Sequence, residues 1–161
     1  MQHLSLTFQK LQEHQLVANR KKCSFGQPQL EYLGHFISAD GLAVDPSKIE
    51  SIVDWPRSKD IKTLRGFLGL TGYYRRFVKG YGKIALPLTN LLKKDSFIWG
   101  EQPQAVFKAL KSSLTSVPVL RMPNFSKQFV IETDASGCGL GAVLMQEGKP
   151  LAFLSKGLSA N

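Results

Sequence analysis

Residues 130–144 read VIETDASGCGLGAVL, and strand-forming residues there lead into Asp134 and then into glycines 137, 139 and 141. Glu132 alternates with Asp134, so both carboxylates are expected on one face of a strand. Carboxylates at strand ends often bind Mg²⁺ for phosphoryl chemistry, but a two-metal site needs several of them. This stretch therefore leaves Asp134 as either a metal ligand or a turn residue. The glycines match no dinucleotide-binding fingerprint, because a strand and not a helix is expected to follow them.

The strand pattern of this stretch is part of a longer series, with strands predicted over 128–134, 141–147 and 151–155. Residues 117–127 contain two prolines and no helical period, which is typical of a linker. Earlier in the chain, the patterns predict helices over 3–15, 45–55, 60–79, 84–94 and 102–116, and short strands over 15–18 and 30–38. Asp45 before Pro46 is typical of an N-cap and a first helical position. The order predicts an α+β protein made of pieces of more than one domain.

The net charge of +9 is concentrated in one third of the chain. Ten of the 21 basic residues but one of the 12 acidic residues, Asp60, lie between Arg57 and Lys94, which leaves eleven of each sign elsewhere. A concentrated positive field suits a polyanion, through phosphate neutralisation and counterion release. A well-solvated helical face is the alternative, but solubility does not require such segregation. The charge pattern therefore favours nucleic acid as a partner.

One face of the predicted 60–79 helix combines glycine with positive charge. Arg65, Gly69, Gly72, Arg76 and Lys79 follow one another at steps of four, three, four and three. A glycine inside a helix costs about 1 kcal/mol relative to alanine, so two of them indicate a close approach to the helix backbone. A nucleic-acid backbone and a closely packed second helix both fit this spacing, and the local charge favours nucleic acid. Tyr73 is beside this face and could lie flat against a sugar.

Composition argues against several other classes of protein. No apolar run reaches the roughly 20 residues of a membrane span, and the N-terminus lacks the order of a signal peptide. Cys23 and Cys138 form no CxxC motif, which indicates free thiols in a reducing compartment. His3, His14 and His35 show no metal-ligand spacing.

Four blocks carry a resemblance to a known family. They are KCSFGQPQLEYLGHFIS (22–38), KIESIVDWPRSKDIKTLRGFLGLTGYYRRFVKGYGKIALPLTNLLKK (48–94), FIWGEQPQAVFKALKSSLTSVPVL (97–120) and FVIETDASGCGLGAVLMQ (129–146). In this order they resemble the Pol polyprotein of gypsy-class long-terminal-repeat retrotransposons. The resemblance implies a palm end with a primer-grip-like hairpin over 1–42, a helical thumb over 43–96, a connecting helix and linker over 97–127, and the first strands of a truncated ribonuclease H-like domain over 128–161.

The resemblance also implies roles for single residues. The strand pair at Tyr32, Leu33 and Gly34 resembles the primer grip, which holds the primer 3′ end. The glycine-bearing helix resembles the track that follows the minor groove of the template–primer. The residues placed beside nucleic acid in this way are Arg65, Gly69, Gly72, Tyr73, Arg75, Arg76, Lys79 and Lys83. Asp134 matches the first metal-binding aspartate of ribonuclease H, with Mg²⁺ as the cofactor of the complete enzyme.

The parent implied by the resemblance is an RNA-directed DNA polymerase and RNA–DNA hybrid nuclease. Its expected partners are a hybrid or DNA duplex template–primer and the rest of the polyprotein, without a membrane, in the cytoplasm, in virus-like particles or in the nucleus. The polymerase Tyr-x-Asp-Asp hairpin is expected before residue 1 and the later ribonuclease H acids beyond Asn161. The chain alone is therefore expected to bind without turnover. A domesticated binding module and a degenerate reading frame are the alternatives.

Overall fold

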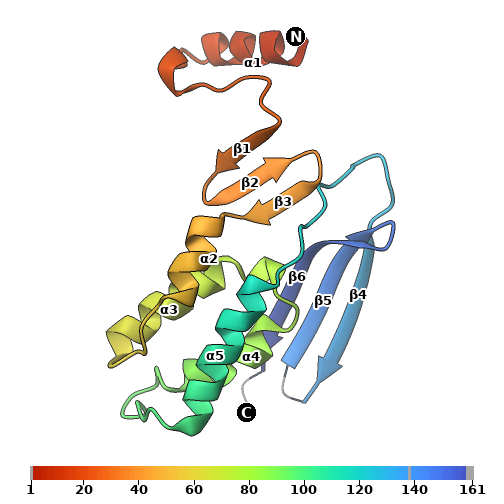
Figure 1. Ribbon diagram of the computed structural model, residues 1–161. Coiled ribbons are helices and arrows are strands. Elements are labelled where there is room, and N and C mark those ends of the chain that lie inside the picture. Colours follow the sequence, from red (N-terminus) through yellow and green to blue (C-terminus); the bar gives the residue numbers. More distant parts are fainter. Residues whose placement is uncertain (1, 138, 159–161) are drawn as a thin grey trace.

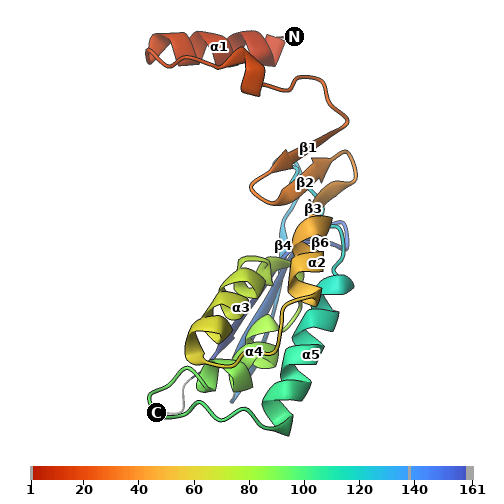
Figure 2. The same ribbon diagram turned by 60° about the vertical axis from the view of Figure 1, so that its left-hand side comes forward.

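The fold is shown by a computed structural model that describes residues 2–137 and 139–158. One helix, α1, stands apart at the N-terminal end, and a small sheet, a group of helices and a second sheet follow it (Figure 1, Figure 2). This mixture of helices and antiparallel sheets confirms the predicted α+β class. In the described ranges, no helix has the length and apolar character needed to cross a membrane.

The N-terminal helix α1 covers Gln2–Glu13, as the apolar period predicted, and buries none of its residues. A short 3₁₀ helix, η1, follows at Arg20–Lys22. The strand predicted over 15–18 is wrong, because Gln15 has a φ of 56° and residues 16–19 are exposed without a strand partner. An extended segment needs a neighbouring strand to satisfy its backbone hydrogen bonds, and none lies beside this one. Cys23 is a free, half-buried thiol, and Cys138 lies outside the described residues.

Strands β1 (Gln29–Tyr32), β2 (His35–Ser38) and β3 (Gly41–Val44) form the first antiparallel sheet in that order. The sequence pattern predicted one strand over 30–38 that ends at 39–41. Leu33 and Gly34 instead have φ values of 50° and 72°, and two consecutive left-handed residues make the tight turn of a hairpin. The pattern therefore missed this turn and β3, whereas the strand pair implied by the family resemblance is confirmed.

Four central helices follow: α2 (Pro46–Val53), α3 (Ile61–Tyr73), α4 (Tyr81–Asn90) and α5 (Glu101–Thr115). The side chains of Asp45 and Asp60 each accept a backbone N–H of the first turn, at 2.8 and 2.7 Å. These N-caps fix where α2 and α3 begin. At the other end of α2, the Lys111 ammonium donates to the Val53 carbonyl at 2.7 Å and so joins α5 to α2.

Two of the predicted helix ranges are wrong in the same region. The helix expected over 60–79 ends at Tyr73, and the helix expected over 84–94 covers Tyr81–Asn90 instead. Tyr74 leaves the helical conformation, and the 3₁₀ turn η2 (Arg75–Phe77) follows. This turn places both Tyr74 and Phe77 in the core, at 2% and 1% exposure. Burial of two large aromatic side chains therefore outweighs continuation of the helix.

The central helices share one hydrophobic core. The Phe67 ring of α3 lies 4.3 Å from the Phe107 ring of α5, between ring centroids. The same core cluster contains fully buried aliphatic side chains, namely Ile52, Leu64, Leu88, Leu110, Leu114 and Leu120. Helix α5 thus packs into the same core as α2, α3 and α4.

Strands β4 (Val130–Ser136), β5 (Gly139–Gln146) and β6 (Lys149–Gly157) form the second antiparallel sheet in that order. All three predicted strands are confirmed, with bounds shifted by a few residues. Strand β6 lies against α4, where the Gly82 N–H donates to Ser155 Oγ at 2.7 Å. The linker after α5 pairs with β3 through two backbone hydrogen bonds between Leu42 and Leu120, at 2.7 and 2.9 Å. The linker therefore connects the two sheets.

Candidate nucleic-acid interface

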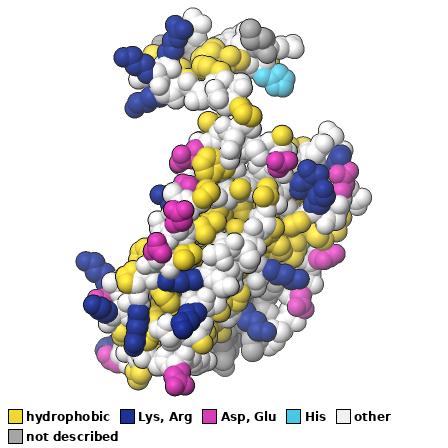
Figure 3. Space-filling model, viewed as in Figure 1, with side chains coloured by type: hydrophobic (Ala, Val, Ile, Leu, Met, Phe, Trp, Pro, Cys, Tyr) yellow, Lys and Arg dark blue, Asp and Glu magenta, His cyan; other side chains and the backbone are white. Residues whose placement is uncertain are grey.

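All ten basic side chains between Arg57 and Lys94 are exposed. Lys and Arg side chains gather over the region where α3 and the loops at its ends lie (Figure 3). The ion pairs found in the described ranges are Lys10–Glu13 and Lys127–Glu147, neither of which uses a residue of this basic segment. The charge of the segment is therefore free to attract an external anion.

The two glycines of the predicted face have different surroundings. A Cβ built on Gly69 would meet no atom within 4 Å, so the backbone of α3 is bare to solvent there. A Cβ on Gly72 would lie 3.5 Å from Tyr81 Oη of α4, which is ordinary van der Waals contact. Gly69 therefore fits the close approach of an external ligand, whereas Gly72 lies next to a neighbouring helix.

The single face predicted from spacing does not exist as one helical surface. Arg65, Gly69, Gly72 and Tyr73 are on α3, but Arg75 and Arg76 are in η2, Lys79 is in the following loop and Lys83 is on α4. The reason is the helix end at Tyr73, which turns the chain before Arg76. The structure brings Arg65 and Gly69 together on α3 and places Lys79 and Lys83 beside the second sheet.

The hairpin residues Tyr32, Leu33 and Gly34 lie against the end of α3. Tyr73 Oη donates to the Leu33 carbonyl at 2.9 Å, and Tyr74 Oη donates to the Gly34 carbonyl at 3.1 Å. The side chains of Tyr32 and Leu33 remain exposed. The structure therefore joins the hairpin tip to the basic helix, although the two are 40 residues apart in sequence.

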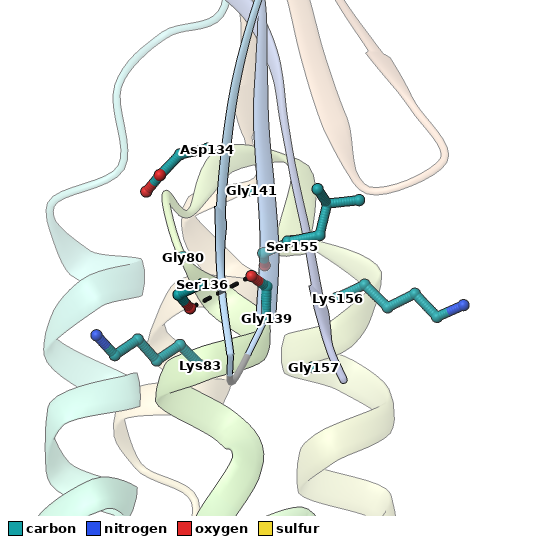
Figure 4. A pocket seen from close by; sticks show the side chains of 10 residues that line it. Gly80, Lys83, Asp134, Ser136, Gly139, Gly141, Ser155, Lys156 and Gly157 are labelled. Atoms are coloured by element: carbon teal, nitrogen blue, oxygen red, sulfur yellow. Dashed lines mark hydrogen bonds between the residues drawn. The ribbon is translucent and has the colours of Figure 1, made fainter. Parts of the chain in front are cut away.

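Asp134 is an exposed residue of the edge strand β4, opposite Gly141 in β5. It lines a hollow of about 190 Å³ together with Gly80 and Lys83 from the helical region and Ser155 and Lys156 from β6. Figure 4 shows Lys83 and Lys156 pointing to opposite sides of this hollow. Glu132 and Lys79 line a neighbouring hollow that Asp134 also borders. Because β4 pairs with β5 in an unbroken register, the two carboxylates share a strand face as the alternation predicted.

Comparisons with known proteins agree with this architecture. Residues 99–161 match the RNase H-like domain found in reverse transcriptase. The chain is 56% identical over 132 residues to an uncharacterized mitochondrial protein of Arabidopsis thaliana, covering 81% of this chain and 84% of that protein. It is 40% identical over 158 residues to the retrovirus-related Pol polyprotein from transposon 297 of Drosophila melanogaster, covering 97% of this chain. The chain belongs to the retrotransposon Pol polyproteins.

Within that family, the chain is a segment of the reverse transcriptase and RNase H-like region. It spans 15% of the transposon 297 polyprotein and 16% of the gypsy polyprotein of Drosophila, to which it is 34% identical. A structure of the foamy viral protease-reverse transcriptase in complex with dsDNA shares the fold, with a TM-score of 0.80 over 97% of this chain and 34% of that chain at 22% identity. The corresponding complex with an RNA/DNA hybrid has a TM-score of 0.78 over 86% of this chain and 20% of that chain, also at 22% identity.

Proteins with reverse transcriptase and RNase H-like domains use divalent metal ions, as phosphoryl-transfer chemistry commonly does. The described part of this Pol segment contains no group of three His, Cys, Asp or Glu residues that could hold such an ion. Asp134 and Glu132 provide two carboxylates on one strand face. The described residues therefore do not make a metal site by themselves.

Sequence reasoning missed His35 and Tyr74 as parts of this region. The sequence places Tyr74 inside the predicted 60–79 helix and His35 among histidines without metal-ligand spacing. The structure buries both beside the hairpin turn, where the His35 ring lies 5.4 Å from the Tyr74 ring between centroids. A tyrosine at a buried position was the available signal, because a buried hydroxyl needs a hydrogen-bond partner.

Proposed function

We propose that this Pol segment contributes template–primer binding to a retrotransposon reverse transcriptase, by holding an RNA–DNA hybrid or a DNA duplex against α3 and the β1–β2 turn. The observation that carries the proposal is the bare backbone at Gly69 on the exposed, basic face that also contains Arg65. A helix surface without a Cβ lets a sugar–phosphate backbone approach closely, and a nearby guanidinium neutralises phosphate.

The other basic residues extend the contact surface along the chain. Arg75, Arg76, Lys79 and Lys83 are exposed and contact phosphates in this proposal, while Tyr32, Leu33 and the exposed ring of Tyr73 contact the sugar side of the duplex. Phosphate contacts position a duplex without reading its sequence. Binding of this kind is strong at low salt and has little sequence preference.

Asp134 has a separate proposed role as one ligand of a Mg²⁺ site in the complete ribonuclease H-like domain. Its exposure on strand β4 and the neighbouring Glu132 carboxylate support this role. Mg²⁺ prefers several oxygen ligands and keeps part of its water shell. Downstream parts of the polyprotein would complete the ligand set, and the segment alone is a binding unit.

A second candidate function is a nucleic-acid-binding module that works without catalysis. The observation that favours it is the Arabidopsis mitochondrial protein, of which this chain covers 84%, so that most of that protein consists of this region alone. Both candidates use the same α3 surface. They differ in whether Asp134 ever becomes part of a metal site.

The substitution Gly69→Leu tests the proposed interface. Leucine is the better helix former by up to about 1 kcal/mol, so the free energy of unfolding is expected to rise slightly. Its side chain fills the space that the ligand backbone would occupy, so affinity for a labelled RNA–DNA hybrid is expected to fall about tenfold or more, a loss of roughly 1.4 kcal/mol. A variant that is more stable but binds the hybrid more weakly shows that Gly69 belongs to the contact surface. A variant that loses both stability and affinity would show that Gly69 is needed for the fold.

The matched control is Ala109→Leu on the exposed side of α5, outside the basic segment. It is expected to leave both affinity and stability nearly unchanged. If Gly69→Leu binds the hybrid as tightly as the parent does, the α3 face is not the interface and the proposal is wrong.

A further inference from the structure

The turn between β1 and β2 holds a leucine in a backbone conformation that leucine rarely adopts. Leu33 has a φ of 50°, and its side chain is 68% exposed, so burial of that side chain does not keep it there. Residues persist in such sparsely populated regions when surrounding contacts determine their conformation. The tight turn of the hairpin requires this conformation, and contacts from another element support it.

Two adjacent tyrosines supply those contacts. Tyr73 is the last residue of α3, and Tyr74 is its C-cap. Their hydroxyls donate to consecutive carbonyls of the turn, Leu33 at 2.9 Å and Gly34 at 3.1 Å. Both can reach the turn because the helix ends between them, and their rings meet edge to face, with centroids 5.0 Å apart.

His35 fills the space beneath the turn. Its Nδ1 lies 2.9 Å from the Leu33 carbonyl, which can only accept, so Nδ1 is the donor. The imidazole ring centroid lies 5.4 Å from those of Tyr73 and Tyr74 and 5.6 Å from that of Phe77, on which it stacks. The Leu33 carbonyl thus accepts from two side chains at once.

The Tyr74 contact also constrains its neighbours. A Cβ on Gly34 would lie 2.8 Å from Tyr74 Oη, so the hydroxyl occupies the space that a side chain would need. Burial raises the pKa of Tyr74 to about 12, so its hydroxyl keeps its proton and donates at neutral pH. The Tyr74 hydroxyl is therefore available as a donor throughout the physiological pH range.

We propose that Tyr73 and Tyr74 are positioning residues, whose hydroxyls fix the β1–β2 turn to the end of α3. The clamp formed by Tyr73, Tyr74 and His35 holds the exposed tip of the hairpin in a constant place relative to Arg75 and Arg76. Its role in binding rests on the proposed function, because the surfaces that it aligns are the two halves of that interface. Such pre-organisation removes an ordering cost that binding would otherwise carry.

The test compares the double variant Tyr73→Phe/Tyr74→Phe with Tyr81→Phe. The double variant keeps the rings and loses both hydroxyls. The control loses a buried hydroxyl that is hydrogen-bonded to Thr71 Oγ1 at 2.9 Å, away from the turn. The first measurement is amide hydrogen exchange over residues 32–36 and at Asp45, whose N–H donates to the Gly34 carbonyl. We expect faster exchange at these amides in the double variant but not in Tyr81→Phe.

The second measurement is affinity for an RNA–DNA hybrid at several salt concentrations. Two lost hydrogen bonds are expected to weaken binding by the double variant on the order of tenfold. The dependence on salt should stay that of the parent, because no charge is removed. Tyr81→Phe should bind like the parent after correction for its folded fraction.

Each outcome decides one part of the inference. Unchanged exchange at the turn in the double variant would overturn the clamp. Faster exchange with unchanged hybrid affinity would overturn its role in binding. If the parent chain does not bind the hybrid, the proposed function fails, and with it the clamp's role in binding, while the exchange measurement still shows whether the tyrosines hold the turn.

Discussion

At the scale of single residues, Asp60 sets the start of the helix that carries the candidate interface. Its carboxylate accepts the Thr63 backbone N–H at 2.7 Å, and its own N–H donates to Thr63 Oγ1 at 3.3 Å, which makes a reciprocal capping box. The Thr63 backbone N–H and, after it, the Thr63 hydroxyl, which donates to Asp60 Oδ1 at 3.0 Å, lower the pKa of Asp60 below its ordinary value of 3.8.

A pH prediction follows from that lowered pKa. The contribution of Asp60 to stability is expected to be full above the ordinary value and to be lost as pH falls from there through the lower folded-state pKa. The stability advantage of the parent over Asp60→Asn should thus be constant near neutral pH and shrink below about pH 4. Chemical denaturation of both proteins from pH 7 to pH 2.5 measures it. An advantage that grows on acidification would contradict this account of the cap.

The structural role of a residue was predictable from the sequence where its hydrogen-bond partner is close by in the chain. Asp45, predicted as an N-cap, and Asp60, predicted only as the start of a helix, both bond within three residues, so a short pattern contains the information that such a cap needs. The contacts of Tyr73 and Tyr74 with the hairpin turn join residues 40 apart. A single sequence does not show that the hairpin turn and the end of α3 lie close together in space. The hydrogen bonds of the two hydroxyls could therefore not be predicted from it.

At the scale of elements, the boundary between α3 and α4 marks the limit of pattern reading. Hydrophobic residues continue at helical spacing through Tyr74 and Val78, so the period predicted a helix to 79. The chain in fact turns at η2, because Tyr74, Phe77 and Val78 all enter the core there. Periodicity reports which residues are buried but not the backbone path between them.

The bridge between β3 and the linker gives a stability prediction at this scale. A Cβ on Gly41 would lie 2.1 Å from the Leu120 carbonyl oxygen, and Gly41 has a φ of 138°. Gly41→Ala must break the bridge or shift both strands, and is expected to lower the free energy of unfolding by about 2–4 kcal/mol. Urea denaturation measures the change.

The matched control for Gly41→Ala is Gly69→Ala. Gly69 has open space at its Cβ position and lies inside a helix, so alanine there is expected to raise the free energy of unfolding by up to about 1 kcal/mol. Equal effects of the two substitutions would show that the Leu120 contact does not hold the linker in place.

At the scale of the whole molecule, the chain joins a helical core to a three-stranded sheet in its RNase H-like region. Strand β6 packs on α4, while β4 is exposed along its whole length. The family resemblance predicted RNase H-like strands after the helices, whereas the order of the predicted elements alone indicated only pieces of more than one domain. Asp134 lies in the resulting hollow beside Lys83, which places a carboxylate of the sheet next to the basic segment.

Asp134 provides a prediction about activity at this scale. The chain alone is expected to show no cleavage of an RNA–DNA hybrid with Mg²⁺ or Mn²⁺, because one strand does not supply the converging carboxylates of a two-metal site. A longer chain that includes the downstream polyprotein should cleave, and Asp134→Asn in that chain should abolish cleavage. Gel analysis of a labelled hybrid measures the extent of cleavage by each chain. Full cleavage by the Asn variant would leave Asp134 as a residue of strand β4 that binds no metal, since the structure already excludes the turn that the sequence left open.

The most direct test of duplex binding by the basic segment is a titration of labelled RNA–DNA hybrid at several salt concentrations. The logarithm of the association constant should fall linearly with the logarithm of salt concentration, with a slope of about −3 or steeper. Arg75→Ala/Arg76→Ala should make that slope shallower by about 2. Lys127→Ala should not change it, because Lys127 pairs with Glu147 in the turn between β5 and β6, outside the basic segment. A salt-independent affinity, or no binding at low salt, would contradict the proposed interface.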